Sequence, residues 1–261
     1  MHELFREKVK LEPLAHVYYH EDGRIFESLS RVRNCIKPKF ESDMLSKMTA
    51  SKRGISQEEV LGEWKATAKV ATDHGTEVHL AMENYQNSAL ILPEHEHLRP
   101  AILAVNALYK DYHAVYQEKT LYDEEYEIAG TADTICATTK HKNSILSLTD
   151  FKTSKSIYFE SKYKKYLLGK FSHIQDSNFY DYNLQISCYS LMLQKLTGRN
   201  IGTLRIIHIP KENPLAFKEI YCPYLKNDAQ LLFDVYKEYR HIKIEEGVTE
   251  KNIQTELPNF Q

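Results

Sequence analysis

The chain lacks several features that would place it in a familiar class. It contains no apolar stretch of about 20 residues, the length that a membrane-spanning helix needs. Residues 1–14 include no apolar signal core, and their acidic side chains argue against a transit peptide. Lys and Arg number 34 against 36 Asp and Glu, so the net charge is only −2 and a uniformly basic nucleic-acid coat is excluded. We therefore expect a cytoplasmic protein without a membrane partner.

Cysteines are few and stand alone. The four are Cys35, Cys136, Cys188 and Cys222, and no two form a CxxC pair. Zinc ribbons and iron–sulfur clusters rely on closely spaced cysteines, so neither is predicted, and the thiols are expected to be ordinary buried residues. The sequence also has no GxxxxGK[ST] phosphate loop, so no helicase motor of that type is expected.

The length of 261 residues and a hydrophobic content of 42% suit one large domain, or one domain with a helical appendage. Periodicity and turn residues predict a hairpin over 16–33 that turns at Glu21-Asp22-Gly23, then helices over 40–52, 56–68, 76–87 and 100–116, with 93–97 as a loop. Further along they predict strands over 117–122, 126–137 and 145–152, a lysine-rich helical segment, a helix over 178–196, strands over 201–210 and 216–221, and a helix over 227–246. This order predicts a mixed α/β core, residues 71–261, with an N-terminal hairpin and helical portion, residues 1–70, packed on it.

One predicted strand ends in a pair of charged residues. Side chains alternate along a strand, so Asp150 and Lys152 share one face and Phe151 points to the other. A carboxylate can hold a hard metal ion, and a neighbouring ammonium can orient a water or neutralise a phosphate. The same tripeptide also fits an exposed ion pair at the end of a strand.

A second carboxylate, Asp133, ends the preceding strand after the small residues Gly130, Thr131 and Ala132. If these two strands pair, Asp133 and Asp150 lie at one edge of the sheet, where two close carboxylates attract a divalent cation. A turn aspartate that caps a local backbone group is the alternative.

Two helices carry polar residues four positions apart, and residues at this spacing share a helix face. His79 and Glu83 form one pair, and neutral imidazole is a common metal ligand. Gln185 and Tyr189 form the other pair. Taken alone, each pair fits an ordinary structural role better than a functional one.

The four patterns occur together and in order, and in this combination the chain resembles the PD-(D/E)XK nuclease superfamily, in its RecB-type and phage-type exonuclease branch. That branch shows Gly-Thr-x-x-His, then Gly-x-x-Asp, Asp-x-Lys and Gln-x3-Tyr. The corresponding segments here are Gly75 to His79, Gly130 to Asp133, Asp150 to Lys152, and Gln185 to Tyr189. The resemblance covers residues 70–210 and departs from the family name at Ala132, where the name has proline. It implies a restriction-endonuclease-like core with a central mixed β-sheet flanked by helices.

The resemblance also implies an activity, the metal-dependent hydrolysis of phosphodiester bonds in DNA, with exonuclease action on DNA ends or single strands in replication, recombination or repair. One or two Mg²⁺ or Mn²⁺ ions would be the cofactor. The implied metal ligands are His79, Asp133, Asp150 and the backbone carbonyl of Phe151. Lys152 would position the attacking water. Further implied roles are support of the metal side by Glu83, and orientation of the substrate or of the catalytic lysine by Gln185 and Tyr189.

A basic tract follows the Asp-x-Lys strand. From Lys152 to Lys170 there are six lysines against a single acid, with aromatic residues between them. Basic side chains can follow phosphates and aromatic rings can stack on unpaired bases, so DNA contacts are predicted at Lys155, Lys162, Lys164 and Lys165. A solvated amphipathic helix is the alternative interpretation.

Other functions fit the same residues. A structure-specific endonuclease or resolvase would use the same site. A non-catalytic DNA-binding protein, accessory to recombination, would use the same fold, but the retention of Asp133, Asp150 and Lys152 argues against it. A metal-dependent hydrolase of another substrate is disfavoured by the basic tract. A recombination protein or a single-strand-binding protein would be a suitable partner for such a nuclease.

Overall fold

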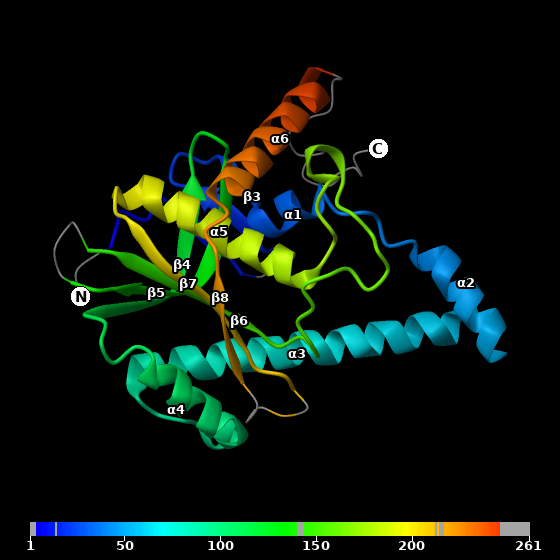
Figure 1. Cartoon of the computed structure of the whole chain (residues 1–261), viewed down its shortest axis with the longest axis horizontal. Coiled ribbons are helices and arrows are strands. Elements are labelled where there is room, and N and C mark those ends of the chain that lie inside the picture. The colour runs from blue at the N-terminus through cyan, green and yellow to red at the C-terminus, as the bar shows by residue number, and fades with distance from the viewer. Residues whose placement is uncertain (1–3, 14, 140–143, 212, 214–216, 246–261) are drawn as a thin grey trace.

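The computed structural model describes residues 4–13, 15–139, 144–211, 213 and 217–245. Within these residues the strands form one mixed sheet in the order β1-β2-β3-β5-β6-β7-β8, and β4 pairs with β5 (Figure 1). The strands are β1 Val9–Glu12, β2 Val17–His20, β3 Ile25–Ser28, β4 Ala114–Asp123, β5 Ile128–Ala137, β6 Leu146–Lys152, β7 Ile201–His208 and β8 Lys218–Cys222. The helices are α1 Leu29–Asn34, α2 Ser42–Arg53, α3 Gln57–Ser88, α4 Arg99–Ala107, α5 Asn178–Thr197 and α6 Lys226–Glu245, with 3₁₀ turns η1 Pro93–Leu98 and η2 Gly169–Phe171.

The sheet opens into a fork at β5. Strand β4 pairs with β5 along its whole length, so β3 and β6 must share the other edge of β5. There β3 pairs in parallel with Ala129, and β6 pairs antiparallel from Thr134 onward. Residues 130–133 lie between these two partners. The fork therefore leaves the middle of β5, which carries Asp133, without a strand partner on this edge.

Helices cover both faces of the sheet. Helices α1, α5 and α6 pack on one face, and α3 and α4 on the other (Figure 1). Strand β6 shows the expected alternation, since Leu148 packs toward α5 whereas Phe151 packs toward α3 and α4. The prediction of a mixed α/β fold with a central mixed sheet flanked by helices is therefore confirmed. Among the described residues, none of the helices is both long and apolar enough to cross a bilayer.

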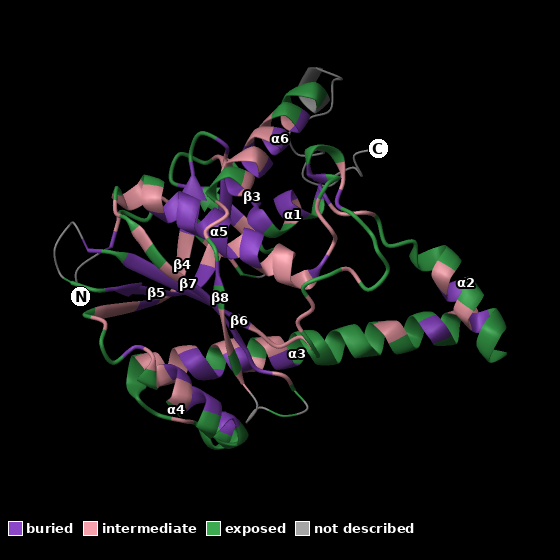
Figure 2. Cartoon of the chain, in the orientation of Figure 1, coloured by how far each residue is buried: buried purple, intermediate pink, exposed green. Residues whose placement is uncertain are grey.

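Helix α3 joins the sheet to an extended arm. Its second half packs on the sheet through Val78, Ala81 and Met82, whereas its first half and α2 extend away from the body and are largely exposed (Figures 1 and 2). A capping box begins the helix, with reciprocal bonds between Ser56 and Glu59.

Several predicted elements have different bounds in the structure. The predicted helices 56–68 and 76–87 are one helix, α3, which continues through Gly75. The predicted hairpin ends at Ser28, whose side chain caps α1. The helix predicted over 100–116 stops at Ala107, and residues 93–98 form a 3₁₀ turn instead of a loop. The lysine-rich segment after β6 is irregular, apart from η2, and is not the predicted helix.

Other predictions agree with the structure. The structure confirms the turn at Glu21-Asp22-Gly23, strands β5 and β6, and helices α5 and α6. Helix α5 ends at Gly198, which is its left-handed C-cap. All four cysteines are free and buried. Residue 216 of a predicted strand and residue 246 of a predicted helix lie outside the described residues. The boundary at residue 70 falls inside α3, and the division into two parts stays a prediction.

Candidate metal centre and active site

Three potential metal ligands converge beside the fork. One ligand atom each from His79, Glu118 and Asp133 lies within 4.8 Å of the others. His79 Nδ1 is 3.6 Å from Glu118 Oε1 and 3.6 Å from Asp133 Oδ1. The three side chains come from α3, β4 and β5. In the described part of the chain this is the one group of three or more His, Cys, Asp or Glu residues with such spacing.

Glu118 reaches the cluster through an unusual backbone conformation. Its φ of 46° lies in the left-handed region, which few residues other than glycine adopt. Strand pairing continues on both sides, at Gln117↔Thr134 and Lys119↔Ala132, so Glu118 stands opposite Asp133. Non-glycine residues in such conformations tend to gather at functional sites. Sequence reasoning missed Glu118 because it looks like any polar residue of an alternating strand.

The carboxylate of Asp133 links strand β5 to strand β6 at the fork. Its Oδ2 accepts a hydrogen bond of 2.6 Å from the backbone amide of Phe151, across from β5 to β6. Its Oδ1 is thereby directed to His79. The position of Phe151, one of the predicted ligands, is thus fixed relative to Asp133, while the role of its carbonyl stays a prediction.

Asp150 and Lys152 form a buried pair, not an exposed one. Lys152 Nζ lies 2.5 Å from Asp150 Oδ2, and their side chains are 15% and 2% exposed. Oδ1 of Asp150 is buried and has no hydrogen-bond partner among the described residues. Asp150 is not a member of the three-residue cluster. The structure thus brings His79 and Asp133 together, adds Glu118, and pairs Asp150 with Lys152 beside them.

The charges of these residues act on one another. Burial of His79 opposes its protonation, but the carboxylates of Asp133 and Glu118 outweigh burial and raise the pKa of His79 to about 9. Burial raises the pKa of Asp133, and the negative charge of Asp150 adds to that effect. For Lys152, burial favours the neutral amine, yet Asp150 and Asp133 raise the pKa of the ammonium above its usual value. A cluster that concentrates negative charge in this way is suited to bind a cation.

The donor atoms fit a small, hard divalent ion. They are carboxylate oxygens and one imidazole nitrogen, the donors that Mg²⁺ and Mn²⁺ accept, with no thiolate among them. The unsatisfied buried oxygen of Asp150 is a further donor beside the cluster. His79, Glu118 and Asp133 can therefore hold a metal, with Asp150 adjacent.

Residues of helix α5 pack against β5 on the other side of the fork. Tyr189 is buried against Gly130, where a Cβ would come within 2.7 Å of Tyr189 Cε1, so only glycine fits there. Gln185 Nε2 donates to Tyr189 Oη at 3.3 Å. The ring of Tyr182, a residue that sequence reasoning missed, lies 5.0 Å from Lys152 Nζ. The predicted pair therefore lies beside the fork, and α5 also contacts the lysine.

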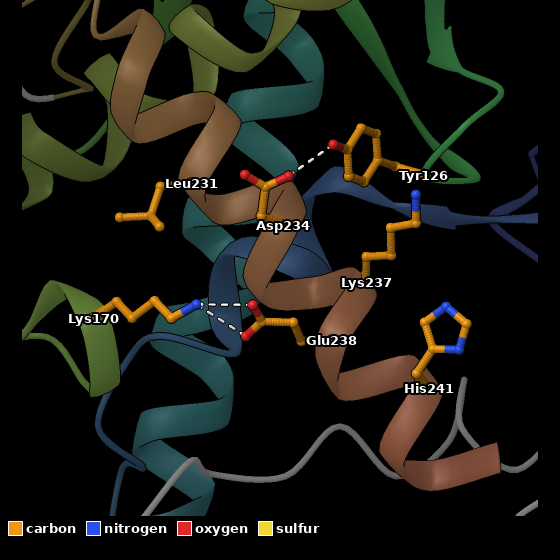
Figure 3. A pocket seen from close by; sticks show the side chains of 7 residues that line it. All are labelled: Tyr126, Lys170, Leu231, Asp234, Lys237, Glu238 and His241. Carbon is orange, nitrogen blue, oxygen red and sulfur yellow. Dashed lines mark hydrogen bonds and ion pairs between the residues drawn. The ribbon is translucent and has the colours of Figure 1, made fainter. Parts of the chain in front are cut away.

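A hollow of about 450 Å³ opens onto the metal cluster. It is lined by Gly75, Thr76, His79, Leu80, Glu83 and Glu118. Glu83, predicted to support the metal side, faces the same space as His79. A second hollow, of about 400 Å³, lies on α6 (Figure 3). There the polar groups already pair with one another, Tyr126 with Asp234 and Lys170 with Glu238, and none of the predicted site residues lines it.

The four lysines predicted to contact DNA are exposed. Lys155, Lys162, Lys164 and Lys165 lie in the irregular segment that runs from the end of β6 to α5. Lys162 Nζ lies 5.1 Å from the centre of the Tyr158 ring. The segment follows directly on the strand that carries Asp150 and Lys152.

No protein family matches the chain, and no curated protein matches it. The chain is similar to a solved structure of a candidate exonuclease from Eubacterium rectale, with 11% sequence identity, coverage of 86% of this chain and 83% of the other, and a TM-score of 0.38. A likeness of this degree does not define a function, which must come from the site itself.

Proposed function

We propose that the chain is a divalent-metal-dependent nuclease that hydrolyses phosphodiester bonds in DNA, built on a PD-(D/E)XK-type core. The proposal rests on two groups of charged side chains that lie at the same fork. One is the cluster of His79, Glu118 and Asp133, and the other is the buried ion pair of Asp150 and Lys152. The ordered motifs of the sequence support it, because their residues lie around this same fork. The division into residues 1–70 and 71–261 belongs to the same proposal.

His79, Glu118 and Asp133 would hold one ion, and Asp150 offers its free oxygen to that ion or to a second one. When bound, a divalent ion lowers the pKa of a coordinated water and draws charge from the phosphate oxygens. Lys152 carries its positive charge at the same place. Because the charges of Asp150 and Asp133 keep Lys152 protonated despite its burial, and its contact with Asp150 holds it in place, it can orient the attacking water and stabilise the charge that develops on the phosphate.

The Asp133–Phe151 bond has a structural part in this scheme. It fixes the strand that bears Asp150 and Lys152 relative to the strand that bears Asp133. Catalytic groups must be held near their productive geometry, and a short bond between the two strands achieves this. Tyr189 and Gln185 support the same arrangement from α5.

The test is digestion of end-labelled linear DNA and of covalently closed circular single-stranded DNA, in Mg²⁺, in Mn²⁺ and in EDTA. We expect cleavage with either metal, none in EDTA, and shortening of linear DNA from its ends while the circle stays intact. Cleavage of the circle would indicate an endonuclease instead. Full activity in excess chelator would contradict the metal-dependent nuclease.

A further inference from the structure

The segment between β6 and α5 exposes large aromatic side chains. Tyr163 is 81% exposed, Phe159 61% and Tyr166 48%. Between residues 153 and 165 the chain carries four lysines against one glutamate. Exposed aromatic residues in a basic setting are unusual on a surface that has no partner.

The segment is built by specific hydrogen bonds. The amide of Ser161 donates to Gln175 Oε1 at 2.9 Å, and the amide of Lys165 donates to Ser161 Oγ at 3.0 Å. Tyr166 and Gln175 form a β-bridge. Tyr163 is a central residue of a tight turn that closes where Lys164 N donates to Ser161 O at 3.2 Å. The exposure of Tyr163 therefore comes from a defined turn.

A row of aromatic rings leads from this turn back to the proposed catalytic lysine. Lys152 Nζ lies over the Tyr182 ring at 5.0 Å, and Lys162 Nζ lies over the Tyr158 ring at 5.1 Å. Phe159 packs on Phe179 with ring centres 4.3 Å apart. The backbone of Tyr158 is joined to the start of α5, because Phe179 N donates to Tyr158 O at 3.3 Å and Tyr158 N donates to Asn178 Oδ1 at 2.8 Å.

These five residues, Tyr182, Tyr158, Phe179, Phe159 and Tyr163, are called the aromatic row. Its inner end is at Lys152 and its outer end is at the exposed turn. In Figure 1 the segment from β6 to α5 lies beside α5, on the side of the molecule from which the arm projects. The row thus begins at the candidate site and ends at the surface.

We propose that the aromatic row binds the bases of an unpaired nucleic-acid strand and leads that strand to the metal centre. This inference rests on the proposed nuclease function and names its substrate class, a single strand or a frayed end. Aromatic rings stack on bases of any kind, but in a duplex the faces of the bases are already stacked on their neighbours. Lys162, Lys164 and Lys165 lie along the same segment and would contact the phosphates.

The experiment is a binding titration by fluorescence anisotropy, with a labelled single-stranded oligonucleotide and the same sequence as a blunt duplex. It is done in EDTA, so that binding is measured without cleavage. The variants are Phe159→Ala, Tyr163→Ala and Tyr163→Phe, and the control is Tyr221→Ala. Tyr221 is 66% exposed on β8, away from the aromatic row.

We expect the wild-type chain to bind the single strand more tightly than the duplex. Phe159→Ala and Tyr163→Ala should each weaken single-strand binding about fivefold to a hundredfold, the usual effect of losing one stacked ring. Tyr163→Phe keeps the ring and should keep the affinity, and Tyr221→Ala should bind like the wild type.

Equal binding of single strand and duplex, or unchanged single-strand affinity in both alanine variants, would overturn the inference. Neither result would affect the proposed function, which is tested by metal-dependent cleavage. Absence of cleavage in Mg²⁺ and Mn²⁺, with the stacking pattern intact, would overturn the nuclease and leave a single-strand-binding surface. The two proposals can therefore fail separately.

Discussion

Individual residues of the candidate site are held in positions that an isolated chain would not favour. Glu118 adopts a left-handed conformation, and Asp150 buries an oxygen without a hydrogen bond. Each costs free energy in the metal-free protein. A bound cation would compensate both, because it supplies a partner for the unsatisfied oxygen and draws the Glu118 carboxylate toward Asp133.

The role of Glu118 can be measured directly. Glu118→Gln keeps the size of the side chain but removes its charge, so we expect Mn²⁺ binding by calorimetry to weaken about tenfold or more, the scale of effects seen around metal sites. Glu58→Gln is the matched control, since Glu58 is an exposed residue in the first turn of α3 and should leave Mn²⁺ affinity unchanged. Equal Mn²⁺ affinity in wild type and Glu118→Gln would remove Glu118 from the metal centre.

Among the elements, the short helix α1 is tied to α5 by a buried ion pair. Arg33 Nη1 lies 2.5 Å from Asp181 Oδ1, and Lys37 Nζ lies 2.8 Å from Asp181 Oδ2. The Arg33 side chain is 9% exposed and that of Asp181 16%. Because α5 carries Tyr182, Gln185 and Tyr189, this pair positions one wall of the candidate site.

The ion pair between Arg33 and Asp181 leads us to predict how the stability of the fold depends on pH. Burial alone would raise the pKa of Asp181, but Arg33 and Lys37 outweigh it and lower the pKa below the ordinary 3.8. A carboxylate with a lowered folded-state pKa stabilises the fold above its unfolded-state pKa, and this contribution is lost as the pH falls through the folded-state value. Asp181→Asn should therefore be less stable than wild type at pH 7, by about 3–5 kcal/mol, the usual cost of removing one partner of a buried pair.

Urea denaturation between pH 7 and pH 3 measures this difference. The gap between wild type and Asp181→Asn should narrow below pH 4. Asp73→Asn serves as the control, since Asp73 has an exposed partner, Lys69, on the same helix and should change stability by no more than about 0.5 kcal/mol. A gap that stays constant down to pH 3 would show that the charge of Asp181 is not the cause.

The elements themselves show what a sequence can and cannot reveal. Helix α5 was predictable because it has a polar N-cap at Ser177 and a glycine at its end, both local signals. The continuity of α3 through Gly75 was not predictable, because a glycine after a periodic stretch is also a common local signal of a helix end. The segment after β6 resembles a helix in composition, but hydrogen bonds to Gln175 and Asn178 hold it in another shape.

At the scale of the whole molecule, the site is the point where elements from four parts of the chain meet. Helix α3 brings His79, β4 brings Glu118, β5 brings Asp133, and β6 brings Asp150 and Lys152. Four of these residues, all except Glu118, were recognisable as motif residues with fixed spacing. Glu118 was not, since its position depends on strand pairing and on a backbone conformation that no local pattern marks. The separation of Asp150 from the three-residue cluster likewise follows from its contact with Lys152.

The central claim is that this meeting point hydrolyses phosphodiester bonds with the help of Lys152. The most direct measurement is the rate of Mg²⁺-dependent cleavage of single-stranded DNA by wild type and by Lys152→Met, which keeps the length of the side chain and removes its charge. Circular dichroism and Mn²⁺ calorimetry on both proteins show whether the fold and the metal centre are retained. We predict a folded, metal-binding variant whose cleavage rate falls about a hundredfold to a thousandfold, the usual effect of losing one preorganised electrostatic contact. Cleavage by Lys152→Met at close to the wild-type rate would contradict the account.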